Sequence, residues 1–312
     1  MIRYRNNISA MLSTIIIYFL FILSMFCANY QLATSLDTQS RRYVMRVMYD
    51  GTKFMGFQSQ PEARTVQGVL SDIISKRIGQ SIPITGASRT DLGVHSRGNC
   101  VHINIPNTVN DFDQAKFQYH LNQMLPLDLK IDNFMRAPET SVDGRVIPLH
   151  ATSSTNGKLY TYTFCTNPVV DPIMRRYCAH FHPKIDLTLF RESLTEFVGT
   201  HDFVSFVNAV AKTKTQYESQ GNVLNTTRSI QSISLESAGE EPGYYKISFQ
   251  LPSALNRMLR NVVGSCLQVA QGAMSLQELR SLLVEAPGRL SNSARPAPPE
   301  GLVLEHVYYD NY

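Results

Sequence analysis

Hydrophobic residues recur with two different periods along the chain after residue 42, and these periods predict alternating strands and helices. Residues 43–49 alternate their side chains between two faces, as in a strand. Between Thr65, which can cap a helix, and Gly79, which can end one, the apolar side chains recur three and four positions apart. The same two periods predict further strands at residues 82–86, 100–105 and 129–135, and a helix at residues 113–125.

The second half of the chain repeats this order of elements. Its predicted strands lie at residues 158–165, 228–235, 244–251 and 302–308, and its helices at 186–199, 255–270 and 276–283. Apart from the extra helix at 276–283, each half follows the order β-α-β-β-α-β. This order predicts an α+β protein with two ferredoxin-like halves, each with a four-stranded antiparallel sheet and helices on one face. We place the N-terminal domain at residues 41–148 and the C-terminal domain at 149–312. Sheets of this kind often bind RNA, although the fold also carries many other functions.

The first forty residues have a different character. Arg3 and Arg5 precede an apolar run over residues 10–27, and no acidic residue occurs before Asp37. A basic stretch before an apolar one is typical of a secretory signal or a signal anchor, although this run is at the short end of the ~20 residues that span a bilayer. We expect residues 1–40 to be a targeting or anchor segment that contacts a membrane or translocon through residues 10–27.

Composition and residue spacing exclude several classes of binding site. The chain has 29 Lys and Arg against 25 Asp and Glu, so nucleic-acid binding would depend on local clusters rather than on bulk charge. Its five cysteines lack the spacing of zinc ligands, and we expect them to be free thiols in a reducing compartment. The histidines also lack metal-ligand spacing, and no phosphate-binding loop or dinucleotide fingerprint occurs. The sequence therefore predicts no metal site.

The densest candidate for chemistry is the loop at residues 86–95. Asp91 lies there between Arg89 and His95, and neighbouring cations favour the ionised form of a carboxyl group. Loops held by rigid strands often carry catalytic groups. The alternative is that Asp91 only caps a turn around Gly93.

Two further segments are candidates for binding. Alternation places Lys158, Tyr160 and Tyr162 on one strand face, where a tyrosine could stack on a base or could simply form a cross-strand aromatic pair. Helical spacing places Arg257, Arg260 and Asn261 on one face, opposite the apolar stripe, and Gly264 would keep that face open. Arginines there could bind phosphate or carboxylate, or could form an ordinary solvated face.

These residues together resemble the TruA-type family of tRNA pseudouridine synthases. The segment Ser88-Arg89-Thr90-Asp91-Leu92-Gly93-Val94-His95 is similar to the catalytic loop of that family, [GS]-R-T-D-x-G-V-H. The resemblance extends over about residues 43–309, and the serine at its first position is most similar to eukaryotic organellar members. Other matching stretches are Tyr49-Asp50-Gly51-Thr52, Thr65-Val66-Gln67-Gly68, His150-Ala151 with Lys158 and Tyr160, and Arg257 through Gly264.

The resemblance implies an isomerase that converts uridine to pseudouridine in the anticodon stem-loop of tRNA, without metal or cofactor. It implies two α/β halves that flank a central RNA-binding cleft, a homodimer, and an organellar location, in the mitochondrion or in a plastid reached through the leader. Asp91 would be the nucleophile or general base, Tyr160 would stack on the target base, and Arg260 would keep Asp91 ionised. Arg89 would help displace the base, while His95, Lys158 and Arg257 would face the RNA backbone or the ribose.

Three positions depart from the family pattern and bear on the choice of substrate: Leu92, Thr152 and Ala254. Two other hypotheses remain open at this stage. One is a catalytically inactive RNA-binding protein of the same fold, and the other is a membrane-anchored interaction protein.

Overall fold

The computed structural model describes residues 40–142, 145–181, 184–208, 225–239 and 241–310. Contacts divide the chain into two compact units, residues 1–42 with 104–111 and residues 43–103 with 112–312. In the described part of the first unit, Arg41 forms an ion pair with Asp111, and Arg42 donates a hydrogen bond of 2.9 Å to the side chain of Asn104. The candidate site residues of the sequence all belong to the second unit.

Of the targeting segment predicted at residues 1–40, residues 1–39 lie outside the described residues. Strand β1 (Ser40–Tyr49) begins where that segment was expected to end. Among the described residues, no helix combines the length and the apolar character that crossing a bilayer requires. The domain boundary between residues 148 and 149 stays a prediction.

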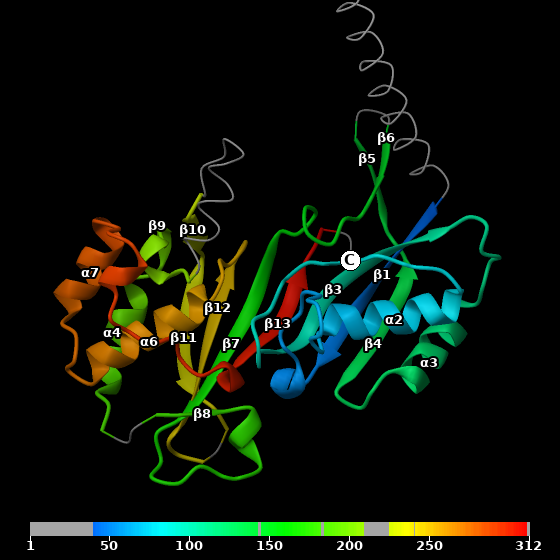
Figure 1. Cartoon of the computed structure of the whole chain (residues 1–312). Helices are drawn as coiled ribbons and strands as arrows, with labels where there is room; N and C mark the ends of the chain where they lie inside the picture. The colour runs from blue at the N-terminus through cyan, green and yellow to red at the C-terminus, as the bar shows by residue number, and fades with distance from the viewer. Residues whose placement is uncertain (1–39, 143–144, 182–183, 209–224, 240, 311–312) are drawn as a thin grey trace, which may run out of the picture. The chain divides into compact units, whose positions relative to one another are not determined.

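One sheet forms the body of the second unit, and its main path runs β11-β12-β7-β13-β3-β1-β4 (Figure 1). Two short strands extend it, since β2 pairs with β3 and β8 pairs with β7. The strands are β2 (Ile84–Gly86), β3 (His95–Pro106), β4 (Leu129–Arg136), β7 (Gly157–Cys165), β8 (Ala179–His180), β11 (Ser232–Ser237), β12 (Tyr244–Leu251) and β13 (Leu302–Tyr308). The mixed α+β class predicted from the sequence is confirmed.

The two strand sets are joined rather than separate, which differs from the two four-stranded sheets expected. Strand β13 pairs in parallel with β3, with Val303 opposite His95 and Leu304 opposite Ser96. The approach is close because Gly98 has no side chain: a Cβ there would overlap the backbone carbonyl of Glu305. The junction therefore makes one continuous sheet from strands of both halves.

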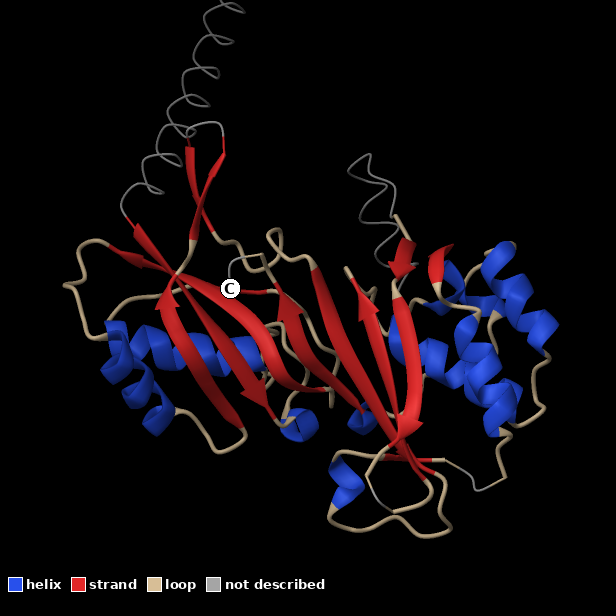
Figure 2. Cartoon of the chain, turned by 180° about the vertical axis from the view of Figure 1, so that it is seen from behind, coloured by secondary structure: helices blue, strands red, loops and turns tan. Residues whose placement is uncertain are grey.

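The helices gather on one side of this sheet. Helices α2 (Val66–Ile78) and α3 (Gln114–Met124) lie against β1, β3 and β4, and Figure 2 shows the opposite face of the sheet without helical cover. Helices α4 (Leu187–Thr195), α6 (Met258–Ala270) and α7 (Leu276–Val284) pack on the strands of the second half. Two antiparallel strand pairs lie outside the sheet: β5 (Glu139–Val142) with β6 (Arg145–Pro148), and β9 (Gly199–Asp202) with β10 (Thr227–Ile230).

Local chemistry explains most helix ends. The Thr65 hydroxyl accepts a hydrogen bond of 3.2 Å from the Gly68 N–H at the start of α2, and Gly79 ends that helix with a φ of 84°. Asp113 and Asp186 cap α3 and α4 in the same way as Thr65 caps α2. Helix α6 begins at Met258 and not at residue 255, because Arg257 adopts a left-handed conformation with φ 56° and ψ 8°.

The interior is dominated by aromatic and aliphatic side chains from one face of β7 and from α6. Phe164 stacks on Phe181 at 4.8 Å between ring centroids and meets Phe190 of α4 edge-on at 5.3 Å. The four cysteines in the described residues are free and buried, in agreement with the thiols predicted from the sequence.

Gly264 of α6 has a packing role that differs from the open face expected. The chain at residues 294–297 lies across this part of the helix, and a Cβ on Gly264 would overlap the backbone carbonyl oxygen of Arg295. The Ala297 N–H donates to the Arg260 carbonyl at 2.8 Å, and the Arg260 Nε–H donates back to the Ala297 carbonyl at 2.7 Å. The glycine is therefore what allows this segment to reach the helix and hold Arg260.

We predict that Gly264→Ala destabilises the protein, because the added methyl group must displace backbone rather than a flexible side chain. The expected loss in the free energy of unfolding is about 1–3 kcal/mol, the usual range for overpacking. Urea titration followed by circular dichroism measures it. Gln271→Ala, at the exposed end of the same helix, is the control and should leave stability nearly unchanged. Equal stability of the two variants would contradict the close approach.

Candidate active site

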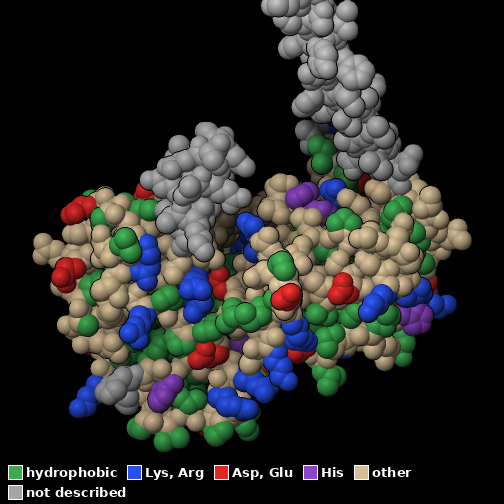
Figure 3. Space-filling model, viewed as in Figure 1, with side chains coloured by type: hydrophobic (Ala, Val, Ile, Leu, Met, Phe, Trp, Pro, Cys, Tyr) green, Lys and Arg blue, Asp and Glu red, His purple; other side chains and the backbone are tan. Residues whose placement is uncertain are grey.

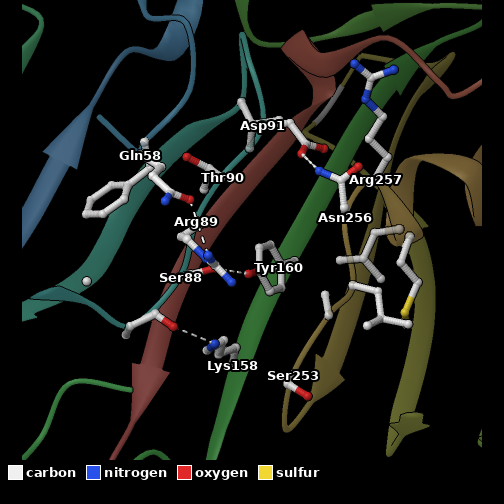
Figure 4. A pocket seen from close by; sticks show the side chains of 18 of the residues that line it. Gln58, Ser88, Arg89, Thr90, Asp91, Lys158, Tyr160, Ser253, Asn256 and Arg257 are labelled. Carbon is white, nitrogen blue, oxygen red and sulfur yellow. Dashed lines mark hydrogen bonds between the residues drawn. The ribbon is translucent and has the colours of Figure 1, made fainter. Parts of the chain in front are cut away.

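A pocket of about 1180 Å³ opens on the helix-bearing side of the sheet, between the β2–β3 loop, strand β7 and the start of α6 (Figure 4). Its lining includes six of the seven residues singled out from the sequence: Arg89, Asp91, Lys158, Tyr160, Arg257 and Arg260. Asp91 is the only acidic residue among the described residues that line it. Figure 3 shows this side of the molecule, where Lys and Arg side chains gather in the lower centre of the view and acidic side chains are scattered.

The loop that carries Asp91 is tied to its surroundings on both sides. Asn99 of β3 holds Ser88 twice: its Oδ1 accepts from the Ser88 N–H at 3.2 Å, and its Nδ2 donates to the Ser88 carbonyl at 2.9 Å. Phe57 N–H donates to the Thr90 carbonyl at 3.0 Å, and the Thr90 hydroxyl lies 2.7 Å from the buried Tyr49 hydroxyl. These bonds pre-position the loop before any substrate arrives.

Asp91 points across the pocket instead of capping its own turn. The Asn256 amide Nδ2 donates to Asp91 Oδ1 at 3.2 Å, and Arg260 Nη1 lies 3.8 Å from Asp91 Oδ2. The second distance is within ion-pair range but longer than a hydrogen bond. The turn itself is closed by the backbone, with Val94 N–H donating to the Asp91 carbonyl at 3.2 Å.

The ionisation of Asp91 reflects two opposed effects. Burial raises the pKa of Asp91, while the positive charges of Arg260 and Arg257 and a backbone hydrogen bond from Arg257 act to lower it. The side chains of Asp91 and Arg260 are 15% and 11% exposed, so solvent screens their attraction weakly. The cations that face the carboxylate thus come from α6 and its N-cap. The residues of the loop itself had pointed to Arg89 and His95, whereas the family resemblance implied Arg260.

Tyr160 lies deeper in the pocket than an exposed stacking residue would. Its side chain is almost fully buried, and its hydroxyl lies 2.6 Å from the Ser88 hydroxyl, so the phenol is held against the Asp91 loop. Burial raises the pKa of Tyr160 to about 12, and the ring is therefore neutral at physiological pH. Phe249 of β12 is its register partner in the neighbouring strand, so an aromatic residue lies opposite Tyr160 in the sheet.

Lys158 is a support beneath the loop rather than a group on the surface. The side chain is buried, and Nζ donates a hydrogen bond of 2.7 Å to the carbonyl of Ala87. Burial lowers the pKa of Lys158 to about 8, and the charge of Arg89 adds to this effect. Lys158 still lines the pocket, and its expected contact with the RNA backbone or the ribose stays a prediction.

Arg89 and Arg257 lie at the rim of the pocket. Arg89 Nη1 donates to the side-chain oxygen of Gln58 at 3.2 Å, as Figure 4 shows. Arg257 is exposed, and its left-handed backbone precedes the first turn of α6. Both guanidinium groups are placed to meet a ligand that enters from solvent.

His95 is the one candidate that the structure places elsewhere. The imidazole is buried at the start of β3, where Nδ1 accepts from the Gly51 N–H at 3.0 Å and lies 3.3 Å from Asp50 Oδ1. It lines a second cavity of about 580 Å³ together with Asp50 and Tyr177. Burial lowers the pKa of His95, and the negative charge of Asp50 partly offsets this effect. The hydrogen bond from Gly51 connects the end of the Asp91 loop to η1 (Gly51–Lys53).

Sequence reasoning missed two groups that shape the pocket, the Asn256 amide and the Gln58 side chain. Neither shows periodicity or a motif of its own, but Asn256 directly precedes Arg257, where one of the stretches that resemble the family begins. Within the part of the chain that the structure describes, no group of three His, Cys, Asp or Glu residues is placed to hold a metal ion.

The family model described as tRNA pseudouridine synthase matches residues 45–145 and 194–310. The chain therefore belongs to the tRNA pseudouridine synthase family, and within it to the TruA-type enzymes, which are isomerases.

Similar curated proteins are bacterial enzymes named tRNA pseudouridine synthase A. The Listeria innocua protein is 32% identical over 86% of this chain and 99% of its own length. The Streptococcus thermophilus protein is likewise 32% identical, over 86% of this chain and 99% of its own length. A solved structure of a Cbf5-Nop10-Gar1 complex aligns with a TM-score of only 0.27 and 9% identity, too low to support a conclusion. Similarity to organellar members stays a prediction.

We predict that Lys158→Met changes how stability depends on pH. Between the folded-state pKa of about 8 and the ordinary value of 10.5, the unfolded chain binds a proton that the folded chain does not. Raising the pH therefore stabilises the wild type through this group, and the variant lacks that gain. The free energy of unfolding of wild type minus variant should rise by on the order of 2 kcal/mol from pH 7 to pH 9.5.

Urea unfolding at both pH values measures this difference. Lys76→Met, which removes an exposed lysine of α2, is the matched control and should show a constant difference. A constant difference for Lys158→Met as well would show that the amine is not buried in solution.

Proposed function

We propose that this protein isomerises uridine to pseudouridine in the anticodon stem-loop of tRNA, with Asp91 as the reacting carboxylate and Tyr160 beneath the target base. The supporting observation is that one carboxylate lines the pocket and is buried between a rigid loop and a fixed guanidinium. The family supplies the reaction class, and the sequence resemblance supplies the stem-loop.

The reaction needs one carboxylate and no redox chemistry. The N1–C1′ bond of the uridine breaks, the uracil turns, and C5 bonds to C1′, while C5 loses a proton and N1 gains one. Asp91 can attack C1′, or remove a proton from C2′, and hold the ribose as a covalent or glycal intermediate while the base turns. Either route requires the ionised carboxylate, which Arg260 and Arg257 favour against burial.

The pocket suits a nucleotide that has left its helix. Its volume of about 1180 Å³ is above the ~300–1,000 Å³ typical of small-molecule sites, which leaves room for more than one nucleoside. A uridine that flips out loses its stacking, at a cost of a few kcal/mol, and must find a new apolar surface. Tyr160 offers such a surface at the floor of the pocket, while Arg89 at the rim can occupy the vacated place in the RNA.

The same proposal extends to the binding of tRNA, the oligomeric state and the location of the protein. The strands of the two halves flank the pocket, with the β2–β3 loop on one side and α6 on the other, and we propose that this cleft binds the tRNA. The proposal includes a homodimer and an organellar location, both carried over from the sequence.

We predict that Asp91→Asn abolishes pseudouridine formation in the full chain. The amide keeps the shape of the carboxylate but can neither attack C1′ nor take a proton, so the single-turnover rate should fall roughly 10³-fold or more. Carbodiimide-arrested primer extension on unmodified tRNA maps the product. Asp72→Asn, which neutralises an exposed carboxylate of α2, is the control and should retain full activity.

The activity of the Asp91→Asn variant and of the wild type distinguishes the proposed enzyme from the alternative hypotheses. Equal modification by wild type and Asp91→Asn would exclude Asp91 as the reacting group. A wild-type chain that binds tRNA without modifying it would favour the inactive RNA-binding protein.

We also predict that Arg260→Gln moves the acid limb of the rate–pH profile to higher pH. The reaction uses ionised Asp91, so the rate falls as the pH drops through the pKa of that carboxyl group. Arg260 lowers this pKa, and an opposite charge at such a distance shifts it by about 1 unit or more. The acid limb of Arg260→Gln should therefore lie at least about 1 pH unit above that of the wild type.

Two variants check the cause of that shift. Arg260→Lys keeps a positive charge near Asp91 and should leave the acid limb close to its wild-type position. Arg89→Gln removes a rim guanidinium that contacts Gln58, and it should weaken tRNA binding without moving the limb. An unchanged limb in Arg260→Gln would contradict the electrostatic role of the pair.

A further inference from the structure

The two oxygens of Asp91 have different surroundings. Oδ1 accepts a hydrogen bond of 3.2 Å from the Asn256 amide, whereas Oδ2 faces Arg260 Nη1 at 3.8 Å (Figure 4). A direct donor restricts the position of one oxygen, while a cation beyond hydrogen-bond distance stabilises charge without occupying the other oxygen. Asn256 therefore holds the Oδ1 oxygen of the carboxylate, while the Oδ2 oxygen stays available to a substrate.

Arg260 is not free to move closer and take the role of Asn256. Its Nε–H donates to the Ala297 carbonyl at 2.7 Å, and its own carbonyl accepts from the Ala297 N–H at 2.8 Å. The guanidinium is thus anchored to the segment that crosses α6 at Gly264. Asn256 accordingly supplies the side-chain hydrogen bond that fixes Asp91 Oδ1.

The backbone around Asn256 is shaped for this contact. Arg257 has a φ of 56°, a conformation that costs a residue with a side chain about 1–2 kcal/mol. Strained conformations of this kind persist where the surrounding structure holds them, often at functional sites. Here Met258 N–H donates to the Leu255 carbonyl at 3.1 Å and the Met258 side chain is fully buried, so the turn is held in place.

The turn directs two consecutive residues toward the same carboxylate. Asn256 offers its side-chain amide and Arg257 its backbone N–H, while the Arg257 guanidinium extends past Asp91 in the close view. Asn256 is itself exposed at the rim, so its amide contributes little to the core. A role in folding therefore does not account for its position.

We propose that Asn256 is a positioning residue for the isomerisation, which anchors Asp91 Oδ1 and leaves Oδ2 as the oxygen that reacts with the ribose. This inference rests on the proposed function, and it adds the Asn256 amide as the group that orients the Asp91 carboxylate. It also assigns the turn that precedes α6, and not only the β2–β3 loop, as a segment that sets how the carboxylate meets the ribose.

The test compares Asn256→Ala and Asn256→Asp with the wild type in the full chain. Asn256→Ala should lower the single-turnover rate at saturating enzyme about tenfold and leave the Kd for tRNA within twofold, because the lost contact is to Asp91 and not to RNA. Asn256→Asp places a second carboxylate beside the first, so the acid limb of its rate–pH profile should move up by more than 1 unit. Gln271→Ala, at the exposed C-terminal end of α6 and outside the residues that line the pocket, is the control and should match the wild type.

A second measurement does not depend on activity. Carbon-13 NMR of labelled aspartate carboxyl groups, with the Asp91 signal assigned by its loss in Asp91→Asn, gives the pKa of Asp91 directly. Asn256→Ala should raise that pKa by about half a unit to one unit, since a hydrogen bond to the charged form is removed. This shift is expected even if the chain modifies no tRNA, so failure of the proposed function and failure of this inference are distinguishable.

Two results would overturn the inference. A weaker Kd for tRNA with an unchanged saturated rate and an unchanged pKa of Asp91 would make Asn256 an RNA contact. No change in the rate, the Kd or the pKa would make the hydrogen bond an incidental surface interaction.

Discussion

The parallel pairing of β13 with β3 is the interaction on which the arrangement of the site depends. It joins strands from the two halves into one sheet, with Val303 opposite His95 and Leu304 opposite Ser96. The loop that follows β2 and leads into β3 carries Asp91, and helix α6, which is separated from β13 by α7, carries Arg260. Because the sheet is continuous, these two groups from distant parts of the chain lie 3.8 Å apart.

Hydrogen bonds across the junction then make the pocket rigid. Lys158 and Tyr160, both on β7, hold the loop through the Ala87 carbonyl and the Ser88 hydroxyl. The cost is that a lysine and a carboxylate are buried, with the pKa of Lys158 lowered to about 8 and the pKa of Asp91 raised. Groups arranged in advance around a reacting carboxylate need no reorganisation during the reaction, and this is a common source of catalytic power.

Local signals predicted the elements well and their junctions less well. Thr65, Asp113 and Asp186 cap helices where a capping side chain precedes an apolar stripe, because the bonds involved span only a few residues. The start of α6 was placed three residues too early, since nothing local announces that Arg257 takes a left-handed conformation. Gly264 was expected to keep a polar face open, but a segment about thirty residues further along the chain covers it.

The sequence by itself determined the α+β class, the order of the main strands and helices, and the family, since periodicity, caps and motifs are local properties of the chain. The strand predicted at residues 228–235 is in fact two, β10 and β11, which belong to different sheets. It also pointed to Asp91, Tyr160 and Arg260, and the structure brings these three to one pocket. Only the tertiary structure decided that His95 faces another cavity, that Lys158 lies beneath the loop, and that Asn256 contacts Asp91. Those outcomes depend on how strands far apart in sequence pair and on what then covers each side chain, and no local pattern encodes either.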